Sequence, residues 1–97
     1  MPGMRTIIAF DISSDSSRYR VVRVLAEYAV RVQKSVFESP TLARAAFLRM
    51  RSRLERHIDP LTDSLRYYQL CATCAARIQH HGAAPGLLDL PDDVEIV

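Results

Sequence analysis

The sequence predicts an α+β fold in one domain, and two alternating patterns lead to that class. Two stretches repeat apolar residues at steps of three and four, as helices with one buried face do. They alternate with short runs of β-branched and aromatic residues that are typical of strands. A chain of 97 residues supports one modest hydrophobic core. Its 48% hydrophobic and 25% charged residues are the proportions of a folded domain rather than of a disordered chain.

The first expected strand is the apolar run Thr6–Phe10, which ends at Asp11. The polar cluster of residues 13–17 follows it and holds several side chains that cap helix N-termini. We therefore expect a helix from this cluster to about Ala29. Its apolar residues recur at helical spacing and predict the buried face, which consists of Val21, Val24, Leu25 and Tyr28.

Residues 31–38 return to strand composition, and we expect two short strands there with a bend near Lys34. The Ser-Pro-Thr run at residues 39–41 is typical of a helix start, because proline at the first helical position loses no hydrogen bond. The second helix is expected to continue to about His57, where an Asp-Pro pair ends it. Its apolar stripe is Phe47, Met50, Leu54 and Ile58.

Leu65–Leu70 predicts the last strand of the core, and residues 94–97 predict a further short strand. The expected order is therefore β-α-β-β-α-β followed by a tail strand. This is a ferredoxin-like plan, with both helices on one face of an antiparallel sheet. We expect one domain over residues 1–97, with its core in 4–82 and a tail in 83–97 that either pairs with a partner chain or stays loose. The sheet face without helices predicts a homodimer packed sheet to sheet, because half-buried apolar strands avoid water.

The net charge of +2 hides an uneven distribution of charged residues. Residues 1–60 carry 11 basic and 6 acidic side chains, whereas residues 61–97 carry 2 and 5. Arginine supplies 12 of the 13 cations, and its planar guanidinium suits phosphate oxygens better than an ammonium does. A basic first part indicates contact with a polyanion. A GC-rich genome, which favours arginine codons, is the alternative explanation.

No apolar run reaches the ~18 residues that a membrane span needs. The N-terminus also lacks the basic-then-apolar pattern of a signal peptide. We therefore expect a cytoplasmic protein without membrane contact.

Three segments carry a resemblance to a known family, namely Phe10-Asp11-Ile12, the run Arg31-Val32-Gln33-Lys34-Ser35-Val36-Phe37-Glu38, and Asp59 with Asp63-Ser64-Leu65-Arg66-Tyr67-Tyr68. With these motifs the sequence resembles the CRISPR-associated Cas two family over most of residues 5–82. The resemblance implies a ferredoxin-like homodimer that binds DNA, RNA or both and works with the CRISPR integrase in acquiring new spacers. Some members of the family are described as metal-dependent endonucleases and others as scaffolds for DNA. Phe10 stands where many members have tyrosine, and Ala29 where many have glycine.

Asp11, at the end of the first expected strand, is the candidate catalytic and metal-binding residue. One carboxylate is a poor magnesium site, because Mg²⁺ takes one or two carboxylates together with waters and phosphates. A two-fold axis near this strand brings the Asp11 side chains of two copies together. The pair then holds Mg²⁺, or alternatively Mn²⁺, which activates water and polarises a phosphate. The alternative is that Asp11 only caps the loop or the first helix through hydrogen bonds.

The expected nucleic-acid contacts are arginines in two groups. One group flanks Asp11 in the expected fold and consists of Arg18, Arg20 and Arg31. The other group shares one face of the second helix, forms a ridge that can follow a DNA backbone, and consists of Arg49, Arg53 and Arg56. For the helical arginines the alternative is an ordinary solvated face. Supporting roles near Asp11 are expected for Phe10, Ser13 and Phe37, with a core position as the alternative for Phe37 and a cap for Ser13.

Cys71 and Cys74 form a C-x-x-C motif that His80 and His81 follow. These are zinc-ligand residue types, but the gap between Cys74 and His80 departs from the usual spacing, and adjacent histidines rarely both bind a metal. A structural disulfide is not expected in a cytoplasmic chain. Nor does the pair open a helix after a first strand, as a thioredoxin-like motif does. The motif is therefore left without a function.

The resemblance implies a CRISPR adaptation protein that supports new-spacer acquisition, either as a metal-dependent endonuclease or mainly as a scaffold for DNA. Two alternatives remain. The first is a small regulatory ferredoxin-like domain that binds a metabolite, although none of the three glycines lies in a phosphate-binding loop. The second is a toxin-type ribonuclease, since one fold serves several functions.

Overall fold

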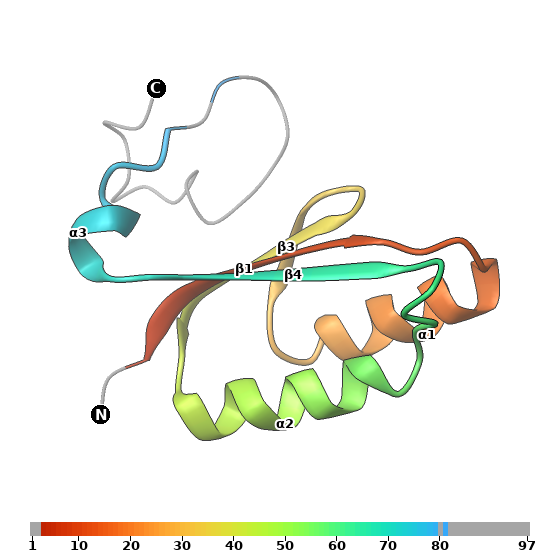
Figure 1. Ribbon diagram of the computed structural model, residues 1–97. Helices are drawn as coiled ribbons and strands as arrows, with labels where there is room; N and C mark the ends of the chain where they lie inside the picture. Colours follow the sequence, from red (N-terminus) through yellow and green to blue (C-terminus); the bar gives the residue numbers. More distant parts are fainter. Residues whose placement is uncertain (1–2, 80, 82–97) are drawn as a thin grey trace.

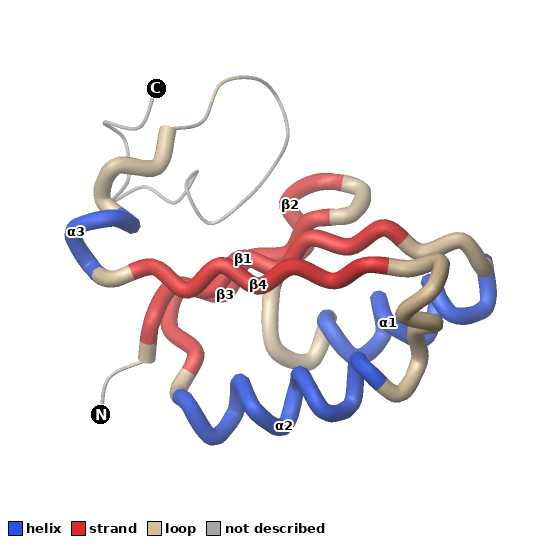
Figure 2. Tube along the Cα trace, viewed as in Figure 1, coloured by secondary structure: helices blue, strands red, loops and turns tan. Residues whose placement is uncertain are grey.

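A computed structural model describes residues 3–79 and residue 81, and it has the α+β plan that the sequence predicts. Figure 1 shows the two long helices on the same side of one sheet, and Figure 2 shows the strands lying together above them. In the described residues the elements follow in the order β1 (Met4–Asp11), α1 (Asp15–Leu25), β2 (Val30–Gln33), β3 (Val36–Leu42), α2 (Arg44–Glu55), β4 (Ser64–Leu70) and α3 (Ala72–Ala75).

The sheet has the strand order β2-β3-β1-β4, and each neighbouring pair is antiparallel. Strand β1 lies between its two long partners, so Ile8 has Phe37 of β3 on one side and Tyr67 of β4 on the other. This order and the two helices on one face confirm the ferredoxin-like prediction. The central position of β1 places its last residue, Asp11, at one end of the sheet rather than at its edge.

The core lies between the sheet and the two long helices. Along β1 the side chains alternate, with Thr6, Ile8 and Phe10 buried toward the helices while Ile7 and Ala9 are only partly buried on the other face. The predicted helical stripes also point inward. Their buried members are Val21, Val24 and Leu25 of α1, and Phe47, Met50 and Leu54 of α2.

The predicted start of the second helix at residues 39–41 is wrong, because these residues extend β3. Pro40 is tolerated there for two reasons. The short β2 pairs with β3 only up to Glu38, so no strand needs a hydrogen bond from position 40 on that side. The β1–β3 pairing also shifts register between Met4 and Thr6, which oppose Leu42 and Ser39, so an irregularity accommodates the proline.

Other expected boundaries differ by less. Helix α1 ends at Leu25 rather than near Ala29, because a turn follows in which the Ala29 N–H donates to the Leu25 carbonyl at 2.8 Å. The expected bend near Lys34 is the turn between β2 and β3. The expected strand at 94–97 and the tail from residue 83 lie outside the described residues. Among residues 3–79 and 81, no helix has the length and apolar composition to cross a membrane.

Candidate functional site

The candidate site is a shallow depression of about 220 Å³ at the end of β1. Asp11 is exposed there, and its carboxylate has no hydrogen bond or ion pair with any other residue that the structure describes. The capping alternative for Asp11 is therefore not supported. Ser14 caps α1 instead, because its Oγ accepts a hydrogen bond from the Ser17 N–H at 3.3 Å. The residues that line the depression are Phe10, Asp11, Ile12, Arg18, Lys34 and Ser35.

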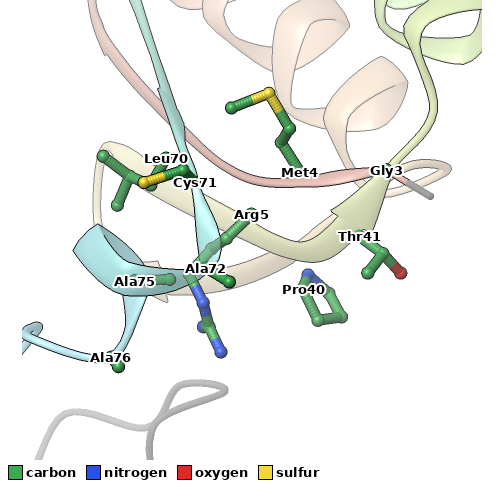
Figure 3. A pocket seen from close by; sticks show the side chains of 10 residues that line it. All are labelled: Gly3, Met4, Arg5, Pro40, Thr41, Leu70, Cys71, Ala72, Ala75 and Ala76. Atoms are coloured by element: carbon green, nitrogen blue, oxygen red, sulfur yellow. The ribbon is translucent and has the colours of Figure 1, made fainter. Parts of the chain in front are cut away.

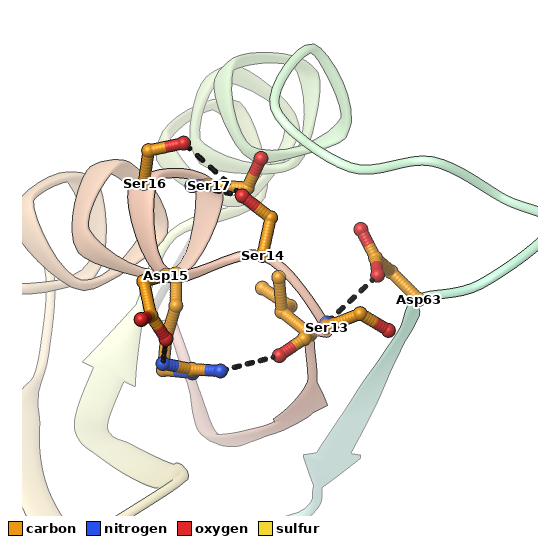
Figure 4. Close-up of polar contacts among 8 residues, drawn as sticks. Ser13, Ser14, Asp15, Ser16, Ser17 and Asp63 are labelled. Atoms are coloured by element: carbon orange, nitrogen blue, oxygen red, sulfur yellow. Dashed lines mark hydrogen bonds and ion pairs between the residues drawn. The ribbon is translucent and has the colours of Figure 1, made fainter.

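The loop after Asp11 is held by the turn that precedes β4. The Ser13 N–H donates to Asp63 Oδ1 at 3.0 Å (Figure 4). The Ser13 hydroxyl donates to the Thr62 carbonyl at 3.3 Å. The other carboxylate oxygen of Asp63 accepts from the Asp59 N–H at 2.9 Å. Ser13 thus supports the site through its contacts with the β4 turn. The sequence had assigned no role to Asp63, and only its place in the third motif drew attention to it.

The hydrogen bonds that Asp63 accepts favour its charged form. The N–H groups of Asp59 and Ser13 are the main reason that the pKa of Asp63 lies below its ordinary value of 3.8. A carboxyl group whose pKa is lowered in the folded state stabilises the fold above the ordinary pKa. This stabilisation is lost as pH falls through the lowered pKa.

Replacing Asp63 with asparagine should lower the melting temperature by a few degrees at pH 7. An amide offers one acceptor oxygen where the carboxylate uses two, so one N–H loses its partner. The difference from the original protein should shrink below about pH 4, as its own Asp63 becomes protonated. Thermal unfolding followed by circular dichroism between about pH 7 and pH 3 measures both effects.

Asp59→Asn is the matched control, because the Asp59 side chain accepts one hydrogen bond, from the Leu61 N–H, and an amide oxygen can still accept it. If Asp59→Asn lowers the melting temperature as much as Asp63→Asn does, the link between the loop and the β4 turn is not what Asp63 contributes.

Two cationic side chains line the Asp11 depression. The guanidinium of Arg18 donates to the Ile12 carbonyl at 2.9 Å and to Asp15 Oδ1 at 2.6 Å, which keeps it beside the end of β1. Lys34 also lines the depression, from the β2–β3 turn. Sequence reasoning did not select Lys34, although it is part of the run of eight residues that carries the resemblance.

Arg31 shapes the turn that carries Lys34. Its Nε and one terminal nitrogen donate to the Lys34 carbonyl at 3.1 and 2.5 Å, and its guanidinium lies 5.7 Å from the centre of the Phe37 ring. The remaining N–H groups of the guanidinium can still donate to a phosphate. Phe37 and Phe10 are both buried in the core, 2% and 6% exposed, with their ring centres 6.3 Å apart. Their packing in the core supports the residues of the site. The core position considered for Phe37 is confirmed.

The other predicted arginines lie elsewhere. Arg20 lines a groove of about 500 Å³ between α1 and α2, together with Tyr19, Arg23 and Arg53. Arg53 binds both carboxylate oxygens of Glu27 at 2.7 and 2.8 Å, and this hydrogen bonding raises the pKa of Arg53. Arg56 lines a separate depression on α2. The middle member of the expected ridge of Arg49, Arg53 and Arg56 thus also connects α2 to the turn after α1.

A magnesium ion needs more ligands than one chain brings together. Within residues 3–79 and 81, no three histidine, cysteine or acidic side chains are grouped for metal binding. Asp11 supplies one exposed carboxylate without competing contacts, which fits an oxygen-loving ion only if water, phosphate or a second carboxylate completes the shell.

Fold and site together define a small ferredoxin-like protein with an unpaired carboxylate beside cationic side chains at one end of its sheet. The sequence matches the family profile described as CRISPR associated protein Cas2 over residues 4–78. The chain belongs to this family.

Individual relatives agree with this assignment. The chain is 40% identical over 80 residues to "CRISPR-associated endoribonuclease Cas2 1" of Chloroflexus aurantiacus. The aligned region covers 81% of this chain and 85% of that protein. The solved structure of Streptococcus pyogenes Cas2 matches with a TM-score of 0.70 and 30% identity, over 81% of this chain and 100% of the other. A chain in a structure titled "Partial Cas6-RT-Cas1--Cas2 complex" shares the fold, with a TM-score of 0.69, 24% identity and coverage of 94% and 95%.

Proposed function

We propose that this protein is a CRISPR adaptation protein that binds nucleic acid as a homodimer and supports new-spacer acquisition with the integrase. The observation that carries the proposal is the Asp11 carboxylate, which is unpaired among the described residues and shares one depression with Arg18 and Lys34. Family membership favours this function over the metabolite-binding and toxin-type alternatives. A fold neighbour was solved within a Cas6-RT-Cas1–Cas2 complex, which is the reason for choosing the integrase as the partner to test.

The homodimer is supported by the sheet face opposite α1 and α2. Ile7 of β1 lies beside Tyr68 of β4 on this face, and Ala9 lies beside Val36 of β3. Tyr68 is 45% exposed, and Val30, on β2 at the other edge of the sheet, is 48% exposed. A second copy that packs on this face removes these side chains from water, and each Å² of apolar surface so buried is worth about 25 cal/mol.

Endonuclease activity, with Mg²⁺ or Mn²⁺ as cofactor, is the second part of the proposal. The Asp11 carboxylates of two copies would hold the ion, which when bound polarises a phosphate and lowers the pKa of bound water. Lys34 and the free N–H groups of Arg31 and Arg18 would bind phosphate oxygens on either side of the carboxylate. The Ser13–Asp63 contacts hold the loop beside Asp11 so that these groups keep their positions. Two relatives named endoribonucleases support this chemistry.

Binding of duplex DNA by the protein together with the integrase should be strongly salt-dependent and independent of base sequence. If the dimer contacts roughly 6–10 phosphates, affinity falls about 10³- to 10⁵-fold between about 50 and 200 mM salt. Lys34→Ala should weaken binding equally for all sequences and reduce the salt slope by about 1 for each phosphate that the variant no longer binds. Fluorescence anisotropy of a labelled duplex, titrated at several salt concentrations, measures both quantities.

Arg77→Ala is the control for charge alone, because it removes one cation at the other end of β4, beyond α3. A salt slope that changes as much in Arg77→Ala as in Lys34→Ala contradicts a specific phosphate contact at the site. Absence of any complex at low salt contradicts the DNA-binding function as a whole.

A further inference from the structure

The C-x-x-C motif, to which neither the sequence nor the proposed function gives a role, forms a local structure of its own. Cys71 follows β4 directly and is the N-cap of the short helix α3, which the sequence did not predict. The Cys74 N–H donates to Cys71 Sγ at 3.5 Å, and the Ala75 N–H donates to the Cys71 carbonyl at 2.8 Å. These bonds hold the two cysteines on one helical turn. Both are free thiols, and both are exposed.

The geometry of that turn suits a covalent bond between the two sulfurs. Cα atoms three residues apart in a helical turn are about 5 Å from each other. A disulfide spans Cα distances of about 4.4–6.8 Å, so the pair can close without moving the strand that precedes it. A structural disulfide is not expected in a reducing compartment, but reversible ones do occur there as redox-sensing or catalytic pairs.

The two thiols differ in their surroundings. Cys71 lines a cavity of about 360 Å³ at the end of the sheet, whose lining also includes Arg5, Leu70 and Pro40 (Figure 3). Ala72 and Ala75 of α3 and Ala76 directly after it belong to the same lining, so this wall has small side chains. Cys74 is also exposed but does not line the cavity.

The two thiols also differ in pKa. A reactive pair needs one thiol that ionises readily and one that keeps its proton. Hydrogen bonds from the backbone N–H and then the thiol of Cys74 lower the pKa of Cys71. Donation of that same thiol to Cys71 raises the pKa of Cys74. The thiolate is the reactive form of cysteine, so Cys71 is the nucleophile and Cys74 retains its proton for a second step.

We propose that Cys71 and Cys74 form a reversible thiol–disulfide pair that exchanges with low-molecular-weight disulfides of the glutathione type. The Cys71 thiolate attacks one sulfur of the reagent, forms a mixed disulfide and releases one thiolate, which takes the proton of Cys74. Cys74 then attacks the Cys71 sulfur and releases the second thiolate, which takes a proton from water. Two protein thiols are oxidised to one disulfide, and one molecule of the reagent is reduced to two thiols.

A zinc site is the competing use of the same residues. Zinc in structural sites takes four ligands, and within the described residues no third histidine, cysteine or acidic side chain is grouped with the pair. The thiol contact and the cavity beside Cys71 favour exchange chemistry instead.

The test is to equilibrate the full chain in mixtures of reduced and oxidised glutathione, block free thiols with an alkylating reagent, and record the intact mass. The original protein should take up two alkyl groups in reduced buffer and none in oxidised buffer, and excess dithiothreitol should restore both. Cys74→Ser should stop at a mixed disulfide with one glutathione on Cys71, because the second step has no nucleophile. In Cys71→Ser the remaining thiol should react with the alkylating reagent several-fold more slowly at pH 7 than Cys71 does.

Both variants change an exposed side chain, and unchanged far-ultraviolet circular dichroism will show that they fold. The proposal is overturned if the original protein keeps both thiols in excess oxidised glutathione. It is equally overturned if oxidation yields only bonds between chains, or if tightly bound zinc protects both thiols from alkylation. None of these outcomes depends on Asp11, so this experiment tests the thiol pair independently of the proposed function.

Discussion

Replacing Asp11 with asparagine is expected to reduce metal-dependent nucleic-acid cleavage by more than about 100-fold. Loss of even an outer partner of a metal ligand typically costs about 10–100-fold, and a carboxylate that binds the ion directly contributes more. The amide keeps the size of the side chain but removes its charge, in both copies of the proposed dimer. Cleavage of labelled RNA and duplex DNA in Mg²⁺ and in Mn²⁺, followed on gels, measures the effect.

The fold and the proposed dimer should survive this substitution, because the Asp11 side chain is exposed and makes no hydrogen bond or ion pair with any other described residue. Light scattering after size exclusion checks the dimer. Glu55→Gln is the matched control, since Glu55 is an exposed carboxylate on α2, outside the Asp11 depression, and an amide oxygen can still accept its hydrogen bond from the Tyr67 hydroxyl. Cleavage that continues unchanged in Asp11→Asn contradicts the catalytic role. If DNA binding with the integrase nevertheless persists, the protein acts as a scaffold.

Replacing Leu54 with alanine should lower the free energy of unfolding by about 2–5 kcal/mol, as buried leucine-to-alanine changes do. Leu54 is completely buried on α2, within the cluster that both long helices and the sheet share. Domains of this size have about 5–15 kcal/mol of stability in total, so a large part of it depends on this one side chain. Urea unfolding monitored by circular dichroism, extrapolated linearly to water, gives the difference.

Leu48→Ala is the internal comparison, because it makes the same chemical change on the same helix at a side chain that is 37% exposed. We expect its effect to stay within about 0.5–1 kcal/mol. Equal losses in the two variants mean that helix propensity, and not burial under the sheet, controls the stability of α2.

The site could be predicted only where its residues are close in sequence. Asp11 was found because it directly follows an apolar strand, and Arg18 because it lies in the next helix. Asp63 was missed, since its contact with Ser13 joins residues 50 positions apart and has no local pattern. The contact of Arg53 with Glu27 was missed for the same reason, because Glu27 lies 26 positions away in the turn after α1.

The sequence alone determined the α+β class, the order of the elements in the core and the inward faces of both long helices. It could do so because helical and strand periodicities are local properties of neighbouring residues. Only the tertiary structure decided that Pro40 lies in a strand, because that depends on how short β2 is. It also decided which cations lie beside Asp11, since the turn after β2 and the start of α1 meet there only when β1 and β3 pair. Contacts between distant segments depend on the packing of the whole chain, and no local pattern encodes them.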